Sequence, residues 1–261
     1  MQCLNRVRSD VERASDSDMV LLLDMCCSLQ GLTSLSCAAD AHVEEEGSSW
    51  DGLAIFREQL LQLELLSGLQ HLALGGFWGG CAFQESLQYA LRALQQLQSL
   101  ELERIAAPSE EPGAAIQAAG VHLAGIYECF PATLSQLRLA EVPVTESLAT
   151  RLPSLTQLRR LLLCDCGMRA AALNMVATAT SRMPVLDEVK MADPNLRTMT
   201  LAELMAAMRP SGLQMNHEVV TPADEGHERD LLQLARREDM CSLFLRAYDE
   251  EWTVVRWHRR R

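Results

Sequence analysis

The segment Cys164-Asp165-Cys166 is the part of the sequence whose residue types and spacing come nearest to metal chemistry. Thiolates and carboxylates can both bind zinc, but a closed structural zinc site needs four ligands. No C-x-x-C pair and no H-x-x-x-H pair follows the segment in the chain, so the set cannot be completed from a recognisable second half. We therefore predict no metal site and expect Cys164 and Cys166 to lie at the end of a strand.

Other side chains give no stronger sign of catalysis. Cys26 and Cys27 could form a redox pair, but adjacent cysteines inside an apolar run are usually buried thiols of low reactivity. The six histidines are scattered, and the sequence has neither an H-E-x-x-H helix nor a G-x-x-x-x-G-K-[ST] phosphate loop. The sequence thus predicts no cofactor and no enzyme active site.

Charge and composition limit the classes of partner. The net charge of -12 and the isoelectric point near 5.0 disfavour a nucleic-acid partner, because binding to phosphates requires an accumulated positive field. Nine cysteines, odd in number and set mostly in apolar runs, favour reduced core thiols. The start MQCLNRVRSD lacks the apolar stretch of a secretory signal, and the run from Met19 to Cys27 is too short to span a bilayer. We expect an intracellular, cytoplasmic protein; whether Met1 is the true start stays open.

One apolar frame recurs along the chain in six copies, with the pattern L-x-x-L-x-L-x-x-(N/C). The first residue of the central L-x-L pair falls at Leu35, Leu72, Leu100, Leu137, Leu161 and Val189. Two of the steps are 28 residues long, and the longer steps contain polar stretches, AADAHVEEEGSS and AAPSEEPGA, which we interpret as inserted loops. Degenerate copies are expected at Leu4 and Val7 before the first copy, and at Leu213 and Met215 after the last.

Stretches with helical spacing lie between these copies. They span residues 52–66, 83–97, 114–130, 168–183 and 198–208. Short strands and helices therefore alternate along the chain, which favours a repeat architecture in which each unit buries its apolar side against the next.

This pattern resembles the leucine-rich repeat family, especially its ribonuclease-inhibitor-like subclass, over residues 1–215. The strongest copy is Leu158, Leu161, Leu163 and Cys166, which has cysteine where the family has Asn or Cys. The resemblance implies an α/β solenoid with parallel β-strands on its concave face and α-helices on its convex face. The other copies depart at the Asn/Cys position, which is occupied by Asp40, Phe77, Ile105, Val142 and Pro194. We therefore expect an irregular solenoid without a continuous asparagine ladder.

Two segments are expected in the domain organisation. Residues 1–215 form the solenoid, with about six to eight repeats. Residues 216–261 form a C-terminal capping helix, over 228–248, and a basic tail. The tail RWHRRR, with Trp252 and Trp257 nearby, could dock on an acidic protein, RNA or a membrane surface, or could be a solvated end.

Candidate partner-binding residues are those that flank the buried pair of each strand, because strand side chains alternate between two faces. They are His71, Glu101, Arg138, Arg160, Leu162, Glu188 and Lys190. Cations on three successive rungs beside an exposed leucine could form a contact patch. Alternatively, Glu101 with Arg138, and Arg160 with Glu188, pair along the ladder, where exposed pairs contribute about 0 to 1 kcal/mol.

Three functions fit these observations. The leading hypothesis is a non-catalytic scaffold that binds another protein, of unknown identity, through the repeat surface. The alternatives are the substrate-recognition subunit of a ubiquitin ligase, since similar repeats occur in such receptors, and a structural subunit of a large assembly. An adaptor-binding segment upstream would favour the ligase, and dependence of the folded chain on neighbours would favour the assembly.

Overall fold

A computed structural model describes residues 31–39, 60–75, 81–105, 123–193 and 206, together with four strands at 6–11, 216–221, 246–248 and 252–257. For those four strands, and for residues 38–39 and 81–83, the structure describes the backbone alone. The chain divides into two compact units, Met1–Ser135 (unit 1) and Gln136–Arg261 (unit 2).

The described part of unit 1 contains four parallel strands. They are β1 (Arg6–Val11), β2 (Ser34–Ala39), β3 (His71–Gly75) and β4 (Ser99–Glu103). Each strand pairs with the next in sequence, and the register sets Val7 opposite Leu35, Leu35 opposite Leu72, and Leu72 opposite Leu100. The predicted early copy at Val7 is therefore confirmed as a rung, whereas Leu4 lies outside the described residues.

The strands of unit 1 form because apolar and polar residues alternate with a period of two. In β3, Leu72 and Leu74 are about 1% exposed, whereas His71 is exposed. In β4, Leu100 and Leu102 are buried, whereas Ser99, Glu101 and Glu103 beside them are half-buried. The repeated L-x-L pair thus supplies two core residues per rung, as the frame predicted.

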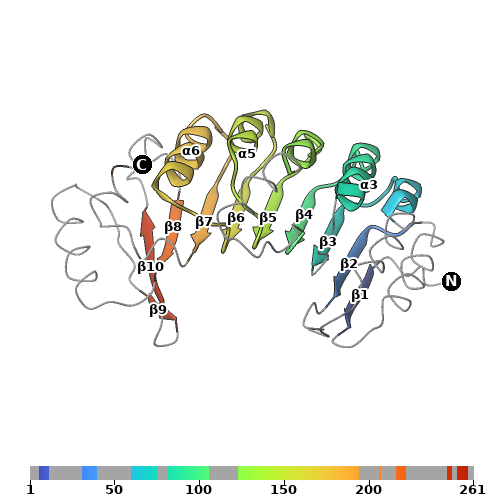
Figure 1. The fold of residues 1–261 in the computed structure, drawn as a ribbon, viewed down its shortest axis with the longest axis horizontal. Helices are drawn as coiled ribbons and strands as arrows, with labels where there is room; N and C mark the ends of the chain where they lie inside the picture. Colours follow the sequence, from blue (N-terminus) through green and yellow to red (C-terminus); the bar gives the residue numbers. More distant parts are fainter. Residues whose placement is uncertain are drawn as a thin grey trace. The chain divides into compact units, whose positions relative to one another are not determined.

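Helical segments cover one side of the unit 1 sheet (Figure 1). They are η2 (Leu63–Leu65), α3 (Cys81–Ala93) and a helical turn at 123–128. Leu87, Ala90 and Leu91 of α3 are fully buried, which is the spacing expected for one face of a helix. Tyr127 and Phe130 meet edge to face, with ring centroids 5.6 Å apart, and are the largest fully buried side chains among the described residues.

Unit 2 begins with four parallel strands and two helical connections. The strands are β5 (Gln136–Ala140), β6 (Arg160–Cys164), β7 (Glu188–Ala192) and β8 (Asn216–Thr221). The helical elements are α5 (Glu146–Arg151), η3 (Leu152–Ser154) and α6 (Ala170–Thr180), and they lie on one side of the sheet (Figure 1). Leu137, Leu161 and Val189 occupy adjacent positions on successive strands and are all 0% exposed.

The last parallel rung corrects a prediction. The register sets His217 opposite Val189 and Val219 opposite Met191, so the pair expected at Leu213 and Met215 is displaced by four residues. Those two residues lie outside the described part of the chain. His217 follows Val189 by 28 residues, a step that occurs twice earlier in the chain. The sequence pattern did not predict this rung, because a polar histidine stands where the first leucine of the L-x-L pair is expected.

The C-terminal end of unit 2 is built from antiparallel strands. β10 (Trp252–Trp257) pairs with β8, and β9 (Arg246–Tyr248) pairs with β10. Of the helix predicted over 228–248, residues 228–245 lie outside the described residues, and the last three form β9 instead. Part of the predicted basic tail is likewise a strand, because β10 includes Arg256 and Trp257. The division at residue 215 into solenoid and C-terminal segment stays a prediction.

These features define an α/β leucine-rich-repeat solenoid fold. In each unit, parallel strands bury an L-x-L pair in one register, and helical connections return the chain along one side of the sheet. Among the described residues, no helix has the length and apolar character needed to cross a membrane.

Candidate interaction surface

The sheet of unit 2 presents a set of side chains on the face opposite its buried leucines. In β6, Leu161 and Leu163 are buried, and the residues between and beside them are exposed or half-buried. We call this surface the β5–β7 face. It consists of Gln136, Arg138, Arg160, Leu162, Cys164, Glu188, Lys190 and Ala192. A regular strand alternation thus brings five of the seven predicted site residues to one face.

Register arranges this face in rows across the strands. Arg138, Leu162 and Lys190 are directly opposite one another on β5, β6 and β7. One row further toward the strand starts, Arg160 lies opposite Glu188. The predicted contact patch therefore exists as a geometric arrangement, whereas its role in binding stays a prediction.

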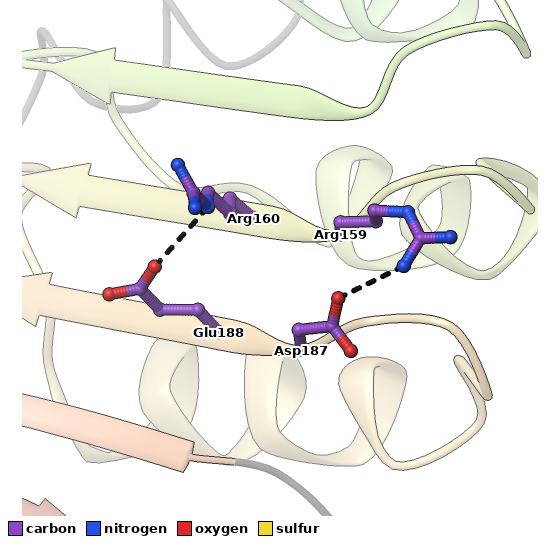
Figure 2. A network of polar contacts seen from close by, with 4 residues as sticks. All are labelled: Arg159, Arg160, Asp187 and Glu188. Carbon is purple, nitrogen blue, oxygen red and sulfur yellow. Dashed lines mark hydrogen bonds and ion pairs between the residues drawn. The ribbon is translucent and has the colours of Figure 1, made fainter.

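An ion pair joins Arg160 to Glu188, as the alternative interpretation predicted. Arg160 Nε lies 3.6 Å from Glu188 Oε2, with the side chains 58% and 42% exposed. A second pair, which the sequence did not suggest, precedes it on the same two rungs: Arg159 Nη1 donates to Asp187 Oδ2 at 3.2 Å (Figure 2). Exposed pairs of this kind contribute about 0 to 1 kcal/mol each, so they orient side chains more than they stabilise the fold.

The remaining predicted site residues belong to unit 1. His71 is exposed at the start of β3, and Glu101 is half-buried in the middle of β4. The register sets them one row apart, since His71 lies opposite Ser99 and Ala73 lies opposite Glu101. The expected pair between Glu101 and Arg138 stays a prediction, because the two residues belong to different units.

Cys166 lies in the turn two residues after β6, in the position that the repeat frame reserves for Asn or Cys. Its thiol is 3.3 Å from the carbonyl oxygen of Leu139 on β5 and 3.3 Å from that of Cys164. Burial raises the pKa of this thiol to about 12, so it remains protonated and can donate at neutral pH. Cys166 therefore links two rungs. Ile105 and Val142, at the same place in other copies, are buried apolar residues.

Tight turns follow the strands with a residue in the left-handed region. Arg104, Glu141 and Asp165 have φ of 50°, 53° and 48°. The backbone N–H groups of Glu141 and Asp165 donate to the last carbonyls of the next strands, at Cys164 and Ala192. A non-glycine residue in this conformation lowers stability by about 1 kcal/mol. The backbone hydrogen bonds to the neighbouring strand offset that loss.

Asp193 is a buried carboxylate that the sequence reading missed. It is 0% exposed, and its Oδ2 accepts a hydrogen bond of 2.7 Å from the Met168 backbone N–H, in the turn between β6 and α6. Burial, and then the nearby Asp193 carboxylate, raise the pKa of Asp165. Asp193 follows Asp165 by 28 residues, so the repeat step itself could have pointed to an aspartate at this turn.

Thiol and carboxylate groups at these turns do not assemble into a metal site. Within the described ranges, no group of three or more His, Cys, Asp or Glu side chains could hold a metal ion. Among the described residues, Cys37, Cys129, Cys164 and Cys166 take part in no disulfide bond. Cys26 and Cys27, the candidate redox pair, lie outside the described residues.

Comparison with solved structures finds several similar chains, among them a leucine-rich repeat protein. The chain is similar to the leucine-rich repeat-containing protein LegL7 from Legionella pneumophila, with 16% sequence identity and a TM-score of 0.41. The similarity covers 81% of this chain and 71% of that chain. No family model matches the sequence, and no curated protein matches it significantly. The fold assignment therefore rests on the register and burial of the chain's own strands.

Proposed function

We propose that this protein is a non-catalytic scaffold that binds another protein through the β5–β7 face. The observation that carries the proposal is the row of Arg138, Leu162 and Lys190, aligned by the register on three neighbouring strands. A leucine held at the centre of a sheet face between two cations offers an apolar contact surrounded by charge. Such a surface suits a protein partner, whose contacts combine an apolar centre with a polar rim.

The proposal also includes the finer assignments suggested by the sequence. The eleven-residue helix α6, between β6 and β7, is long enough for the ribonuclease-inhibitor-like subclass. The absence of disulfide bonds among the described cysteines, Cys37, Cys129, Cys164 and Cys166, favours a reducing, intracellular compartment. Under this proposal the chain uses no cofactor, and its partner is a protein and not a nucleic acid.

Affinity capture from an extract of the native cells tests the proposal. The wild-type chain is expected to retain a partner protein that Leu162→Glu loses, because a buried carboxylate would replace the apolar centre. Leu65→Glu is the matched control, since Leu65 is 66% exposed on a helical segment of unit 1. Equal capture by Leu162→Glu and wild type would exclude the β5–β7 face.

A turnover screen tests the non-catalytic part separately. Purified wild-type chain is expected to show no hydrolase, transferase or redox activity above a buffer control. Activity that is abolished by a substitution in this chain, and that copurifies with it, would contradict the proposal.

A further inference from the structure

The helical side of unit 1 exposes two large hydrophobic side chains on neighbouring elements. Among the described residues, Leu65 in η2 is 66% exposed and Tyr89 in α3 is 52% exposed. The helical segment that ends with η2 packs against α3, and the two lie side by side (Figure 1). Exposed hydrophobic residues that occur singly are ordinary, whereas two on elements that pack together mark a contact surface.

Glu64 connects the two elements at this surface. The Tyr89 hydroxyl hydrogen-bonds with the Glu64 side chain, and this bond, together with the negative charge of Glu64, raises the pKa of Tyr89. Glu64 is exposed and is followed in the chain by Leu65. Its carboxylate therefore lies at the hydroxyl end of the tyrosine ring. Because a carboxylate has about four lone-pair sites, the bond from Tyr89 leaves acceptor sites for a partner.

One stripe of α3 is turned toward the next helical segment of the unit. The Gln88 side chain packs closely against Gly125, where a Cβ atom would meet its amide group. One turn further along α3, Arg92 Nε donates to Cys129 Sγ at 3.2 Å. Both contacts are made with the segment 123–129, so Arg92, the basic residue in the described part of this helix, is drawn to that side.

The neighbouring stripe of α3 carries Glu85 and Tyr89. The two residues are four apart, so they lie on one face of the helix about 6 Å from each other along its axis, and both are exposed. Since Tyr89 reaches Glu64, this stripe is the one beside η2. Among the described residues, neither Glu64 nor Glu85 takes part in an ion pair. We call Glu64, Leu65, Glu85 and Tyr89 the η2–α3 patch.

The groups of this patch match those that bind a guanidinium. The planar group of arginine stacks on the face of a tyrosine ring and donates two parallel hydrogen bonds to a carboxylate. The patch holds the Tyr89 ring and the Glu64 carboxylate next to each other, and Leu65 offers an apolar contact to the methylene stem of the arginine. The ammonium of lysine has neither the plane nor the fork of donors, so it interacts through its charge alone.

Glu85 provides a second acidic group at a spacing that suits a peptide. Side chains on one face of an extended chain recur at about 6.8 Å. This interval is close to the about 6 Å between Glu85 and Tyr89 along the helix axis. A segment with two basic residues separated by one other residue can therefore place one cation at Tyr89 and the other at Glu85.

We propose that the η2–α3 patch binds an arginine of a partner protein, in a segment with a second basic residue two positions away. The arginine stacks on Tyr89 and pairs with Glu64, and the second cation lies over Glu85. The net charge of -12 on the whole chain attracts such a segment. This surface belongs to the helical side of unit 1, so it is an interaction site in addition to the β5–β7 face, and the failure of either proposal leaves the other standing.

Three short peptides test the preference for arginine. The probe is a fluorescent peptide with the sequence Gly-Ser-Arg-Ser-Arg-Ser-Gly, and in two comparison peptides both arginines are replaced by lysine or by citrulline, which keeps the shape of arginine without its charge. Anisotropy is expected to show saturable binding of the arginine peptide, with the lysine peptide at least about fivefold weaker and the citrulline peptide at least about twentyfold weaker. Equal binding of the arginine and lysine peptides would overturn the proposal, because it would show attraction to charge alone.

Variants locate the binding on the patch. Glu64→Gln and Tyr89→Leu are each expected to weaken binding of the arginine peptide at least about fivefold. Both residues are exposed, so the variants should keep the circular dichroism spectrum and Tm of the wild type. Glu128→Gln is the matched control, because it removes the same charge from another exposed glutamate of unit 1 and should change binding less than about twofold. Equal weakening by Glu128→Gln and Glu64→Gln would contradict the assignment of the site.

The tyrosines of the chain give a second, direct readout. There are three, so incorporation of fluorotyrosine gives three fluorine NMR signals, and Tyr89→Phe identifies the signal of Tyr89. The arginine peptide is expected to shift this signal and to leave that of Tyr127, which is 0% exposed, in place. Binding that leaves the Tyr89 signal unshifted would overturn the proposal.

A truncated chain distinguishes a partner from the chain's own basic end. Deleting residues 258–261 removes His258 and the three arginines that follow it, and it should leave the affinity for the arginine peptide unchanged. A peptide that binds only after this deletion would show that the chain itself occupies the patch, and the proposal of a partner would then be wrong.

Discussion

At the scale of single residues, Cys166 gives the turn after β6 a thiol that holds two rungs. A hydroxyl could donate to the same carbonyls, of Leu139 and Cys164, without ionising in the alkaline range. The pKa of the folded thiol, about 12, is above its ordinary value of 9.0. Stability from the protonated thiol is thus fully present below pH 9 and is lost as pH rises toward 12.

We predict that Cys166→Ser reduces the alkaline loss of stability. The free energy of unfolding of the wild type should fall between pH 9 and pH 11 by at most about 1.4 kcal/mol per pH unit from this thiol. Urea titrations at several pH values would measure the slope. Cys164→Ser, at a half-buried thiol two residues earlier at the end of β6, is the control and should keep the wild-type slope. An unchanged slope in Cys166→Ser would contradict the assignment.

Asp193 supports a second residue-scale prediction. Asp193→Ala removes the acceptor of the Met168 N–H in a fully buried site, and a buried donor without a partner costs about 1 to 3 kcal/mol. Asp187→Ala removes an exposed pairing with Arg159 and should change stability by less than about 0.5 kcal/mol. Chemical unfolding of both variants compares a buried and an exposed aspartate. Equal effects would show that the turn does not depend on the Asp193 carboxylate.

At the scale of elements, the strands could be predicted well because a period of two is a strong signal over five residues. The pairs at Leu72, Leu100, Leu137, Leu161 and Val189 all lie on rungs, as the frame indicated. The last rung was missed because His217 is polar. The segment WTVVRW carries residues favoured in strands, but its position beside the arginines of the C-terminal end indicated a basic tail instead.

The candidate site was partly predictable for the same reason. The alternation of side chains along a strand predicted that Arg138, Leu162 and Lys190 lie on the sheet face opposite the buried leucines. The pair of Arg159 with Asp187 was not predicted, since both residues precede their strands, where alternation gives no rule. Asp193 was missed because a buried aspartate depends on a backbone donor 25 residues earlier.

Leu161 and Leu162 are neighbours in β6 that point to opposite faces of the sheet, so substituting each in turn tests which face belongs to the core. Leu161→Ala removes a 0% exposed core side chain and should lower the free energy of unfolding by about 2 to 5 kcal/mol. Leu162→Ala removes a half-buried side chain from the open face and should cost less than about 1 kcal/mol. Denaturant unfolding of the two variants measures the difference. Comparable losses would mean that the face carrying Leu162 is also core.

At the scale of the whole molecule, each rung of a solenoid is stabilised by the rungs beside it. The last strand has a neighbour on one side only, so the backbone groups on its other side must be covered if the chain is to stay monomeric. In unit 2, the described sheet ends with β10 on β8 and β9 on β10, an antiparallel arrangement that follows four parallel strands. Antiparallel strands at this end pair the backbone of β8 on the side away from β7. An unpaired strand edge would otherwise be a template for association with another chain.

Truncation should expose that edge. Deleting residues 216–261 removes β8, β9 and β10 and leaves the backbone of β7 without the partner that it has in the intact chain. We predict a lower Tm and association into larger species, measured by thermal unfolding and by size-exclusion chromatography with light scattering. Deleting only residues 258–261, beyond β10, is the control and should leave a monodisperse chain with the wild-type Tm. A monomeric 1–215 chain with an unchanged Tm would show that the parallel rungs need no antiparallel cap.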